Sequence, residues 1–152
     1  MDATAVAREL LAPIPAHATT GLEVVRAADG VGVVALSAPP ELANVIGSLH
    51  SSGLIALIDA AGLAAIIASV PTAAAMTGVV PLGATATLRF LAPARGRLTA
   101  TCTLDSAARE QLALLFAGSA HRVKIKTTAA VRDQHDTVAC EGTFDWSVRR
   151  AA

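Results

Sequence analysis

Aromatic residues are scarce in this sequence, which holds three Phe, one Trp and no Tyr. Proteins that hold single-stranded nucleic acid depend on aromatic rings that stack with the bases, so the sequence does not support a base-stacking surface. The acidic and basic residues number 12 each, and the formal net charge is +0. No global field therefore attracts nucleic acid or an acidic membrane surface, and we expect no nucleic-acid partner.

Cysteine is equally rare, and the usual catalytic motifs are missing. Cys102 and Cys140 have neither a CxxC arrangement nor metal-ligand spacing. Both fall on the inward faces of expected strands, which favours reduced core thiols in a cytosolic protein. The four histidines are too scattered to predict a metal site, and there is no GxSxG, GxGxxG or P-loop motif. The first residues lack the basic and apolar regions of a signal peptide, so we expect a cytoplasmic protein.

Charge is sparse relative to apolar residues, which make up 53% of the chain against 16% for charged residues. The charged residues are too few to cover the surface of a monomer, so we expect a buried interface between copies of the chain. A chain of 152 residues can bury a real core, and we expect a single domain over residues 1–152.

The most apolar stretch runs from Leu49 to Val70 and carries one charge, Asp59. It is long enough to span a membrane, but Asp59 would then lie near the bilayer midplane at a cost of roughly 3 kcal/mol. The flanks also lack the Lys/Arg cluster and the Trp/Tyr belt of spanning helices. We therefore expect a buried helix over about Leu49–Ser69 and no membrane partner.

Alternation of apolar and polar residues on either side of this helix predicts antiparallel strands with one buried face. In chain order the expected elements are a helix from Asp2 or Thr4 to about Leu11, strands Gly21–Ala27 and Val31–Ser37, the central helix, strands Leu82–Leu91 and Arg97–Leu104, a helix over Ser106–Phe116, and strands Arg122–Arg132 and Thr137–Val148. In the third strand the inward residues are expected to be Leu82, Ala84, Ala86, Leu88 and Phe90. This order predicts an α+β fold in which a curved antiparallel sheet wraps around the central helix.

Four residues around the start of the central helix carry a resemblance to a known family. Asn44, Gly47, His50 and Asp59 follow one another at intervals that resemble the hotdog-fold thioesterases, more narrowly the PaaI-like acyl-CoA thioesterases. The run from Arg89 to Gly96 is similar to the family's strand ending in a Pro-Ala-Gly turn. The inserted helix after Asp105 resembles an uncharacterised hotdog subgroup.

One position departs from that family. Its His-Gly-Gly is His50-Ser51-Ser52 here, with Gly53 following. In the family, the first Gly of the pair usually offers its backbone N–H to the thioester oxygen. Ser51 offers the same N–H, but its side chain narrows the approach to it.

The resemblance implies a thioester hydrolase that cleaves a fatty or aromatic acyl-CoA, with coenzyme A as part of the substrate and no metal or other cofactor. It implies a homodimer or a dimer of dimers (a homotetramer), whose groove takes Asn44 and Ser51 from one subunit and Asp59 from the other. Asp59 would act as base or nucleophile, and the Ser51 N–H as the oxyanion donor. The alternative is a non-catalytic acyl-CoA or fatty-acid-binding protein. A scaffold that uses the fold only to dimerise would hold Asp59 in a salt bridge.

Each candidate residue also has a structural interpretation. Asp59 is the only ionisable residue of the helix, and it either contacts the substrate or bonds a backbone amide or the partner subunit. Asn44 either orients water or forms a turn. His50 is a candidate catalytic residue together with Asp59, Asn44 and Ser51, but it lies on the opposite side of an ideal helix from Asp59, so we expect it to fix the loop. Ser48 or Ser51 is expected to cap the helix.

Further residues are assigned to substrate binding. An ideal helix places one stripe along the groove, comprising Ser52, Ile55, Asp59, Gly62 and Ile66. Gly47 and Ser52 are expected near the substrate. Arg89, Arg95 and Arg97 surround one turn, where they either meet the phosphates of coenzyme A or form a solvated rim.

Overall fold

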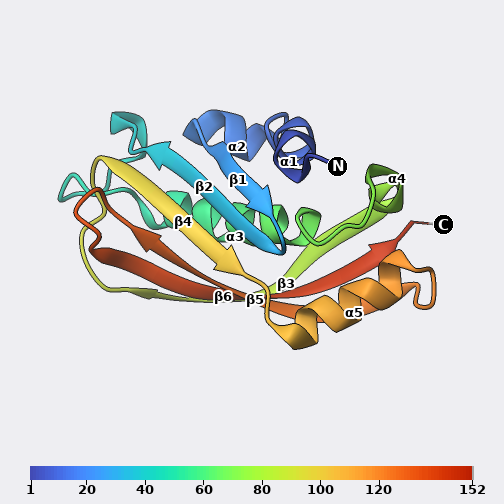
Figure 1. The fold of residues 1–152 in the computed structure, drawn as a ribbon. Coiled ribbons are helices and arrows are strands. Elements are labelled where there is room, and N and C mark those ends of the chain that lie inside the picture. The colour runs from blue at the N-terminus through green and yellow to red at the C-terminus, as the bar shows by residue number, and fades with distance from the viewer. Residues whose placement is uncertain (152) are drawn as a thin grey trace.

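The computed structural model describes residues 1–151. Its elements, in chain order, are α1 (Ala3–Leu11), α2 (Pro15–Thr20), β1 (Glu23–Ala28), β2 (Val31–Ser37), the 3₁₀ helix η1 (Pro40–Leu42), α3 (Ser51–Ile67), α4 (Ala73–Met76), β3 (Val79–Phe90), β4 (Arg97–Thr103), α5 (Ser106–Phe116), β5 (Arg122–Arg132) and β6 (Val138–Arg150). The strands form one antiparallel sheet in the order β1-β2-β4-β5-β6-β3 (Figure 1). The predicted α+β plan is confirmed.

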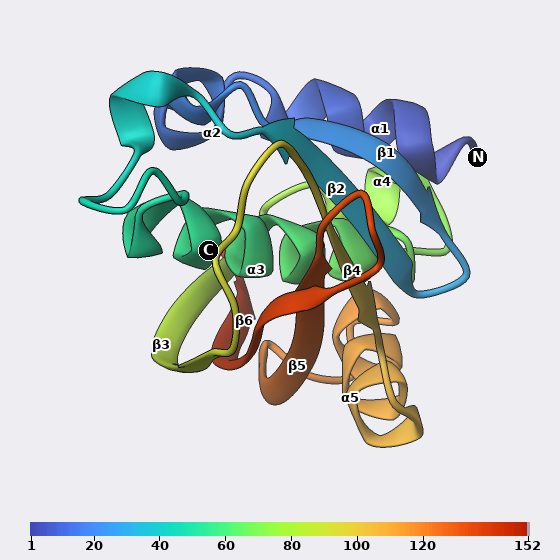
Figure 2. The same cartoon turned by 90° about the vertical axis from the view of Figure 1, so that its left-hand side faces the viewer.

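The sheet curls around α3, with β1 and β2 on one side of the helix and β3, β5 and β6 on the other (Figure 2). Helix α3 is apolar on nearly every side, and its large residues Leu57, Ile58 and Ile66 are fully buried. Burying each such side chain stabilises the fold by about 1.5–3 kcal/mol. The sheet lies close against α3 at Gly32, where an added Cβ would lie 2.4 Å from the carbonyl oxygen of Ala61.

Helix α3 begins two residues later than the pattern predicted, because the chain before it is held in an extended conformation. The Leu49 N–H donates to the Ala94 carbonyl at 2.8 Å, and Leu49 forms an isolated bridge with Ala43. His50 is the N-cap residue, so the prediction that Ser48 or Ser51 caps the helix was wrong. Ser48 is buried instead, and its hydroxyl oxygen accepts from the Ala94 N–H at 2.8 Å.

The N-terminal segment holds one predicted helix and one that was missed. Asp2 caps α1 as predicted, by accepting from the N–H groups of Thr4 and Ala5. Helix α2 was missed because the two prolines of this segment were interpreted only as a stop. Pro15 instead occupies the first turn of a new helix, where its missing N–H costs nothing, and Gly21 ends the helix with a φ of 69°.

The inward face predicted for β3 was wrong in two respects. The register shifts between Gly83 and Thr85, so Leu82 opposes Ser147 on the outer face while Ala86 opposes Phe144 on the inner face. A β-bulge of this kind breaks the period of two. Strand β3 is also an edge of the sheet with little helix over it, so its inner-face Phe90 is 57% exposed.

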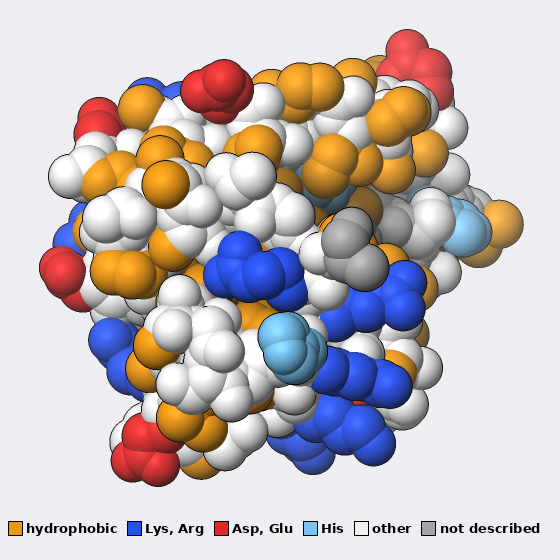
Figure 3. All heavy atoms as spheres, turned by 90° about the vertical axis from the view of Figure 1, so that its right-hand side faces the viewer, with side chains coloured by type: hydrophobic (Ala, Val, Ile, Leu, Met, Phe, Trp, Pro, Cys, Tyr) orange, Lys and Arg blue, Asp and Glu red, His pale blue; other side chains and the backbone are white. Residues whose placement is uncertain are grey.

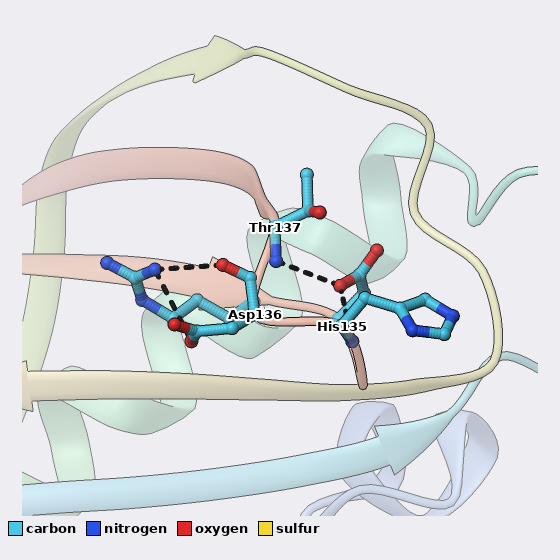
Figure 4. A network of polar contacts seen from close by, with 5 residues as sticks. His135, Asp136 and Thr137 are labelled. Atoms are coloured by element: carbon cyan, nitrogen blue, oxygen red, sulfur yellow. Dashed lines mark hydrogen bonds and ion pairs between the residues drawn. The ribbon is translucent and has the colours of Figure 1, made fainter.

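The late strands follow the sequence closely. On β5 the inward residues alternate as predicted and are buried: Val123, Ile125, Thr127, Ala129 and Val131. On β6 both Ala139 and Cys140 are fully buried, because the β5–β6 register is irregular next to them. The β5–β6 turn is fixed by Asp133, whose Oδ1 accepts from the N–H groups of His135 and Thr137 at 2.9 and 3.0 Å (Figure 4).

The helix inserted after β4 is also confirmed. Asp105 caps α5 by accepting from the Ala108 N–H at 2.8 Å, and Gly118 follows the helix with a φ of 77°. Within residues 1–151, none of the helices is both long and apolar enough to cross a membrane.

Candidate active site

A hollow of about 400 Å³ opens at the start of α3, between the preceding loop and the end of β3. Its lining residues are Asn44, Ile46, Ser48, Leu49, His50, Ser51, Leu54, Phe90, Ala92 and Pro93. We call it the α3 pocket. It unites three of the predicted site residues, Asn44, His50 and Ser51, with an apolar wall from Leu54 and Phe90. The fold therefore joins residues that are separated by the whole of α3 and β3 along the chain.

Asn44 shapes the loop that forms one side of the α3 pocket. Its side-chain carbonyl oxygen accepts from the N–H groups of Ile46 and Ser48 at 3.1 and 3.0 Å. Gly47 completes the turn with a φ of 72°, and its N–H donates to the Asn44 carbonyl at 3.0 Å. The turn-forming role of Asn44 is thus present, and within residues 1–151 its side-chain NH₂ donates no hydrogen bond.

The first turn of α3 contributes Ser51 and Leu54 to the lining of the α3 pocket. The Ser52 N–H donates to His50 Nδ1 at 3.1 Å, and the Ser52 hydroxyl oxygen lies 2.8 Å from the same nitrogen. His50 therefore fixes the helix start, as predicted from its position, and Ser52 points to this cap. Ser51 is the first helical residue, and its N–H has no hydrogen-bond acceptor among the described residues.

Asp59 lies on the same helix but away from the α3 pocket. It follows Ser51 by eight residues, which is about 12 Å along the helix axis. Its side chain is 31% exposed, and its Oδ2 lies 3.8 Å from Nε2 of His17, which is 3% exposed. One chain therefore does not bring Asp59 to the group that Ser51 N–H could bind.

The accessible stripe of α3 differs partly from the predicted one. Ser52, Ile55 and Asp59 are accessible, but Gly62 and Ile66 are buried, so their assignment to the groove was wrong. An added Cβ on Gly62 would lie 2.9 Å from Thr127 Oγ1, which shows that this face packs on the sheet. An ideal-helix projection could not reveal which side the sheet covers.

The three arginines predicted to meet phosphates have different partners. Arg89 forms an ion pair with Glu141 at 3.1 Å, and Arg97 pairs with Glu23. Arg95 donates to the Ile46 carbonyl at 2.8 Å, which attaches it to the Asn44 loop. Of the three, Arg95 alone is bonded to that loop.

A second group of cations lies at the other end of the sheet. In Figure 3, Lys and Arg side chains gather on the lower part of the face at the right of Figure 1. Arg122 and Lys124 belong to the start of β5 and Arg149 to the end of β6, where Arg122 pairs directly with Arg149. All three are exposed, as expected for a solvated strand face.

His17 is the residue that the sequence analysis missed. It belongs to the unpredicted helix α2, and nothing in its neighbourhood along the chain points to Asp59.

The described residues contain no group of three or more His, Cys, Asp or Glu side chains with metal-binding geometry. Both thiols are buried and free, and burial raises the pKa of Cys102 and of Cys140 to about 11.

The six-stranded antiparallel sheet wrapped around one long helix is the hotdog fold, and solved structures of that fold match nearly the whole chain. A Pseudomonas aeruginosa protein of unknown function, described as a probable thioesterase, is 23% identical with a TM-score of 0.77, over 97% of this chain and 95% of its own. A thioesterase from Haemophilus influenzae is 17% identical with a TM-score of 0.69, over 93% and 87%. The Escherichia coli PaaI protein of the phenylacetic acid degradation operon is 16% identical with a TM-score of 0.70, over 99% and 94%.

The family is given by the sequence itself. Residues 3–148 match the model of the Domain of unknown function (DUF4442), and the chain belongs to this family. No curated protein matches the sequence significantly. The predicted hotdog fold is confirmed.

Proposed function

We propose that this protein hydrolyses acyl thioesters, with a fatty or aromatic acyl-CoA as the substrate class. The observation that carries the proposal is the Ser51 N–H at the start of α3 in a hotdog fold, which has no acceptor among the described residues and belongs to a residue that lines the α3 pocket. A helix N-terminus stabilises negative charge through its N–H groups and its dipole. The tetrahedral intermediate of thioester hydrolysis carries such a charge on the former carbonyl oxygen.

The chemistry assigns one role to each group. The thioester carbonyl oxygen accepts from the Ser51 N–H, and the acyl chain lies against Leu54 and Phe90. Asp59 either takes a proton from the water that attacks the carbonyl carbon, or attacks that carbon itself. In both cases the C–S bond breaks and the thiolate leaves; in the second case water then hydrolyses the mixed anhydride, which releases the acid and restores the Asp59 carboxylate. The reaction in this form uses no metal or redox cofactor. The apolar walls favour an uncharged acyl group.

Two copies of the chain complete the site in this proposal. Ser51 and Asp59 of one chain are about 12 Å apart along α3, too far to act on one carbonyl. Both lie on α3, which the edge strand β3 leaves partly uncovered. Ile55 of α3 is 41% exposed, and Phe90 at the end of β3 is 57% exposed. An unpaired edge beside exposed apolar residues favours association with a second copy. The proposed dimer has a two-fold axis that brings Asp59 of one subunit opposite Ser51 of the other.

The first test measures thiol release from a panel of acyl-CoAs by chromatography. Asp59→Asn is expected to lower kcat about a hundredfold or more. Ser51→Pro is expected to lower kcat about 10²–10³-fold, because it removes the N–H that donates to the oxyanion. Proline is tolerated at the first helical position, and the preceding His50 already has a φ of −58° and a ψ of 149°. Ser51→Ala keeps the N–H and is the matched control.

The shared site is tested by mixing the two inactive variants. Random reassociation of Asp59→Asn with Ser51→Pro makes roughly half of the dimers mixed, and each mixed dimer has one intact site. About a quarter of the wild-type activity should return. One variant carries a mass tag, so that native mass spectrometry can count the mixed dimers. Recovery near zero in a mixture that contains mixed dimers contradicts a site shared between subunits.

The rival function, a binder without turnover, has one observation in its favour. Ser51 and Ser52 occupy the positions where the resembling family has glycines, and Ser51 is one of the residues that line the α3 pocket. A wild-type protein that releases no thiol while acyl-CoA raises its melting temperature is a binder. If the wild type releases thiol and Asp59→Asn abolishes this release, the protein is a thioesterase.

A further inference from the structure

The carboxylate of Asp59 lies close to an ionisable group from a distant part of the chain. Nε2 of His17 lies 3.8 Å from Asp59 Oδ2. Among the described residues, His17 is the only basic group within 4.0 Å of Asp59. Helix α2 has no other ionisable side chain, and α3 has none besides Asp59. On the neighbouring α1, the Arg8 guanidinium is bound to the carbonyl oxygens of Val24 and Val25.

The imidazole of His17 is fixed from its other side. Nδ1 lies 3.0 Å from the Leu11 carbonyl oxygen, and because a carbonyl only accepts, Nδ1 carries a hydrogen. The backbone of His17 is held as well. Its N–H donates to the Ile14 carbonyl at 2.9 Å, and its carbonyl accepts from Thr20 Oγ1 at 2.9 Å. The ring is thus oriented with Nε2 as the atom that faces Asp59.

The contact between the two side chains is defined by its geometry. The fixed Nε2 of His17 and Oδ2 of Asp59 are 3.8 Å apart, which is within the range of an ion pair but longer than a hydrogen bond.

The exposure of the two partners differs in a way that suits a working carboxylate. His17 is 3% exposed, whereas Asp59 is 31% exposed and stays open to a reacting molecule. An ion pair that only joined α2 to α3, as in a scaffold, would need no such opening. A reacting group must be held in the correct orientation and must also stay accessible to the substrate. A buried histidine beside an accessible carboxylate meets both conditions.

We propose that His17 is a positioning residue, which holds the Asp59 carboxylate through Oδ2 and leaves its other oxygen for the attacking water or the acyl carbon. The inference rests on the proposed thioesterase function. Because His17 is buried behind Asp59, it contacts no substrate. Its loss should therefore change kcat and leave KM nearly unchanged.

Three variants separate positioning from structure. His17→Asn places an amide near Nδ1, which keeps the bond to Leu11, but it reaches less far and loses Asp59. We expect kcat to fall about 10- to 100-fold, as for a reacting group displaced by about an ångström. His17→Gln keeps a donor near Nε2 and should retain most of kcat. Thr20→Val removes the Thr20 bond to the His17 carbonyl without touching the ring, and should lower stability while keeping kcat.

A double-mutant cycle with Asp59→Asn completes the test. If His17 acts through Asp59, adding His17→Asn to Asp59→Asn lowers the residual kcat no further. If the kcat losses of the two substitutions add in the double variant, the role of His17 is overturned and the thioesterase function stands. The same conclusion follows if the wild type cleaves acyl-CoA and the His17→Asn variant has the same kcat. A wild type that cleaves none of the acyl-CoAs removes the function, and the role of His17 with it.

Discussion

The single tryptophan makes one contact of the core directly measurable. Trp146 Nε1 donates to Thr127 Oγ1 at 2.7 Å, and both residues are buried. They lie on neighbouring strands β6 and β5, against Gly62 of α3, one turn beyond Asp59. This contact belongs to the surface on which the helix with the candidate carboxylate rests. We therefore expect Thr127→Val to weaken the fold without filling or emptying space.

The magnitude follows from what the substitution leaves behind. Valine replaces the hydroxyl of threonine by a methyl group of similar size, so no cavity forms. The indole N–H loses its acceptor in a site that is 2% exposed at both residues, where water does not reach. An unpaired buried donor costs about 1–3 kcal/mol. For a domain of about 150 residues, each kcal/mol lowers the melting temperature by roughly 2–4 °C.

Urea denaturation followed by circular dichroism and by Trp146 fluorescence measures this loss. All tryptophan emission comes from this site, since the chain has one Trp. The control is the Trp146→Phe background, in which Thr127→Val should be nearly neutral, because no N–H is left to satisfy. An equal loss in both backgrounds, or none in the wild-type background, refutes the reasoning.

Three further outcomes are expected. Gly32→Ala should lower the free energy of unfolding by about 3 kcal/mol in urea denaturation, because the new Cβ would lie 2.4 Å from backbone of α3. Asn44→Asp should keep the wild-type melting temperature, since its carboxylate still accepts from the loop N–H groups, whereas Asn44→Ala should lower it. Burial, with the Glu141 charge as a second cause at Cys140, raises the pKa of Cys102 and of Cys140 from 9.0 to about 11. The native state then holds these protons more tightly, so stability is intact below pH 9 and is lost as pH rises through about 11, by up to about 1.4 kcal/mol per pH unit for each thiol. Urea midpoints at pH 8 and pH 10.5 check this, and a Cys102→Ala/Cys140→Ala variant should lose less.

Much of the candidate site was predictable because it depends on local sequence. The Asn44-to-His50 loop forms with residues close in the chain, and a helix that starts after it must present free N–H groups. The position of Ser51 at that helix start therefore followed from the pattern and the resemblance. The contact of Asp59 with His17 did not, since it joins two helices through the packing of α2 on α3.

The order of elements, the alternating faces of β4 and β5, and the burial of α3 were determined by the sequence, because period and composition fix which face of each element avoids water. Tertiary structure alone decided that β3 is an edge strand with a bulge, so that Phe90 is exposed despite its apolar pattern. It also decided that Gly62 packs on the sheet while Asp59 stays accessible. The physical reason is the same in both cases: pattern specifies that a face is covered, but what covers it depends on contacts between residues far apart in the chain.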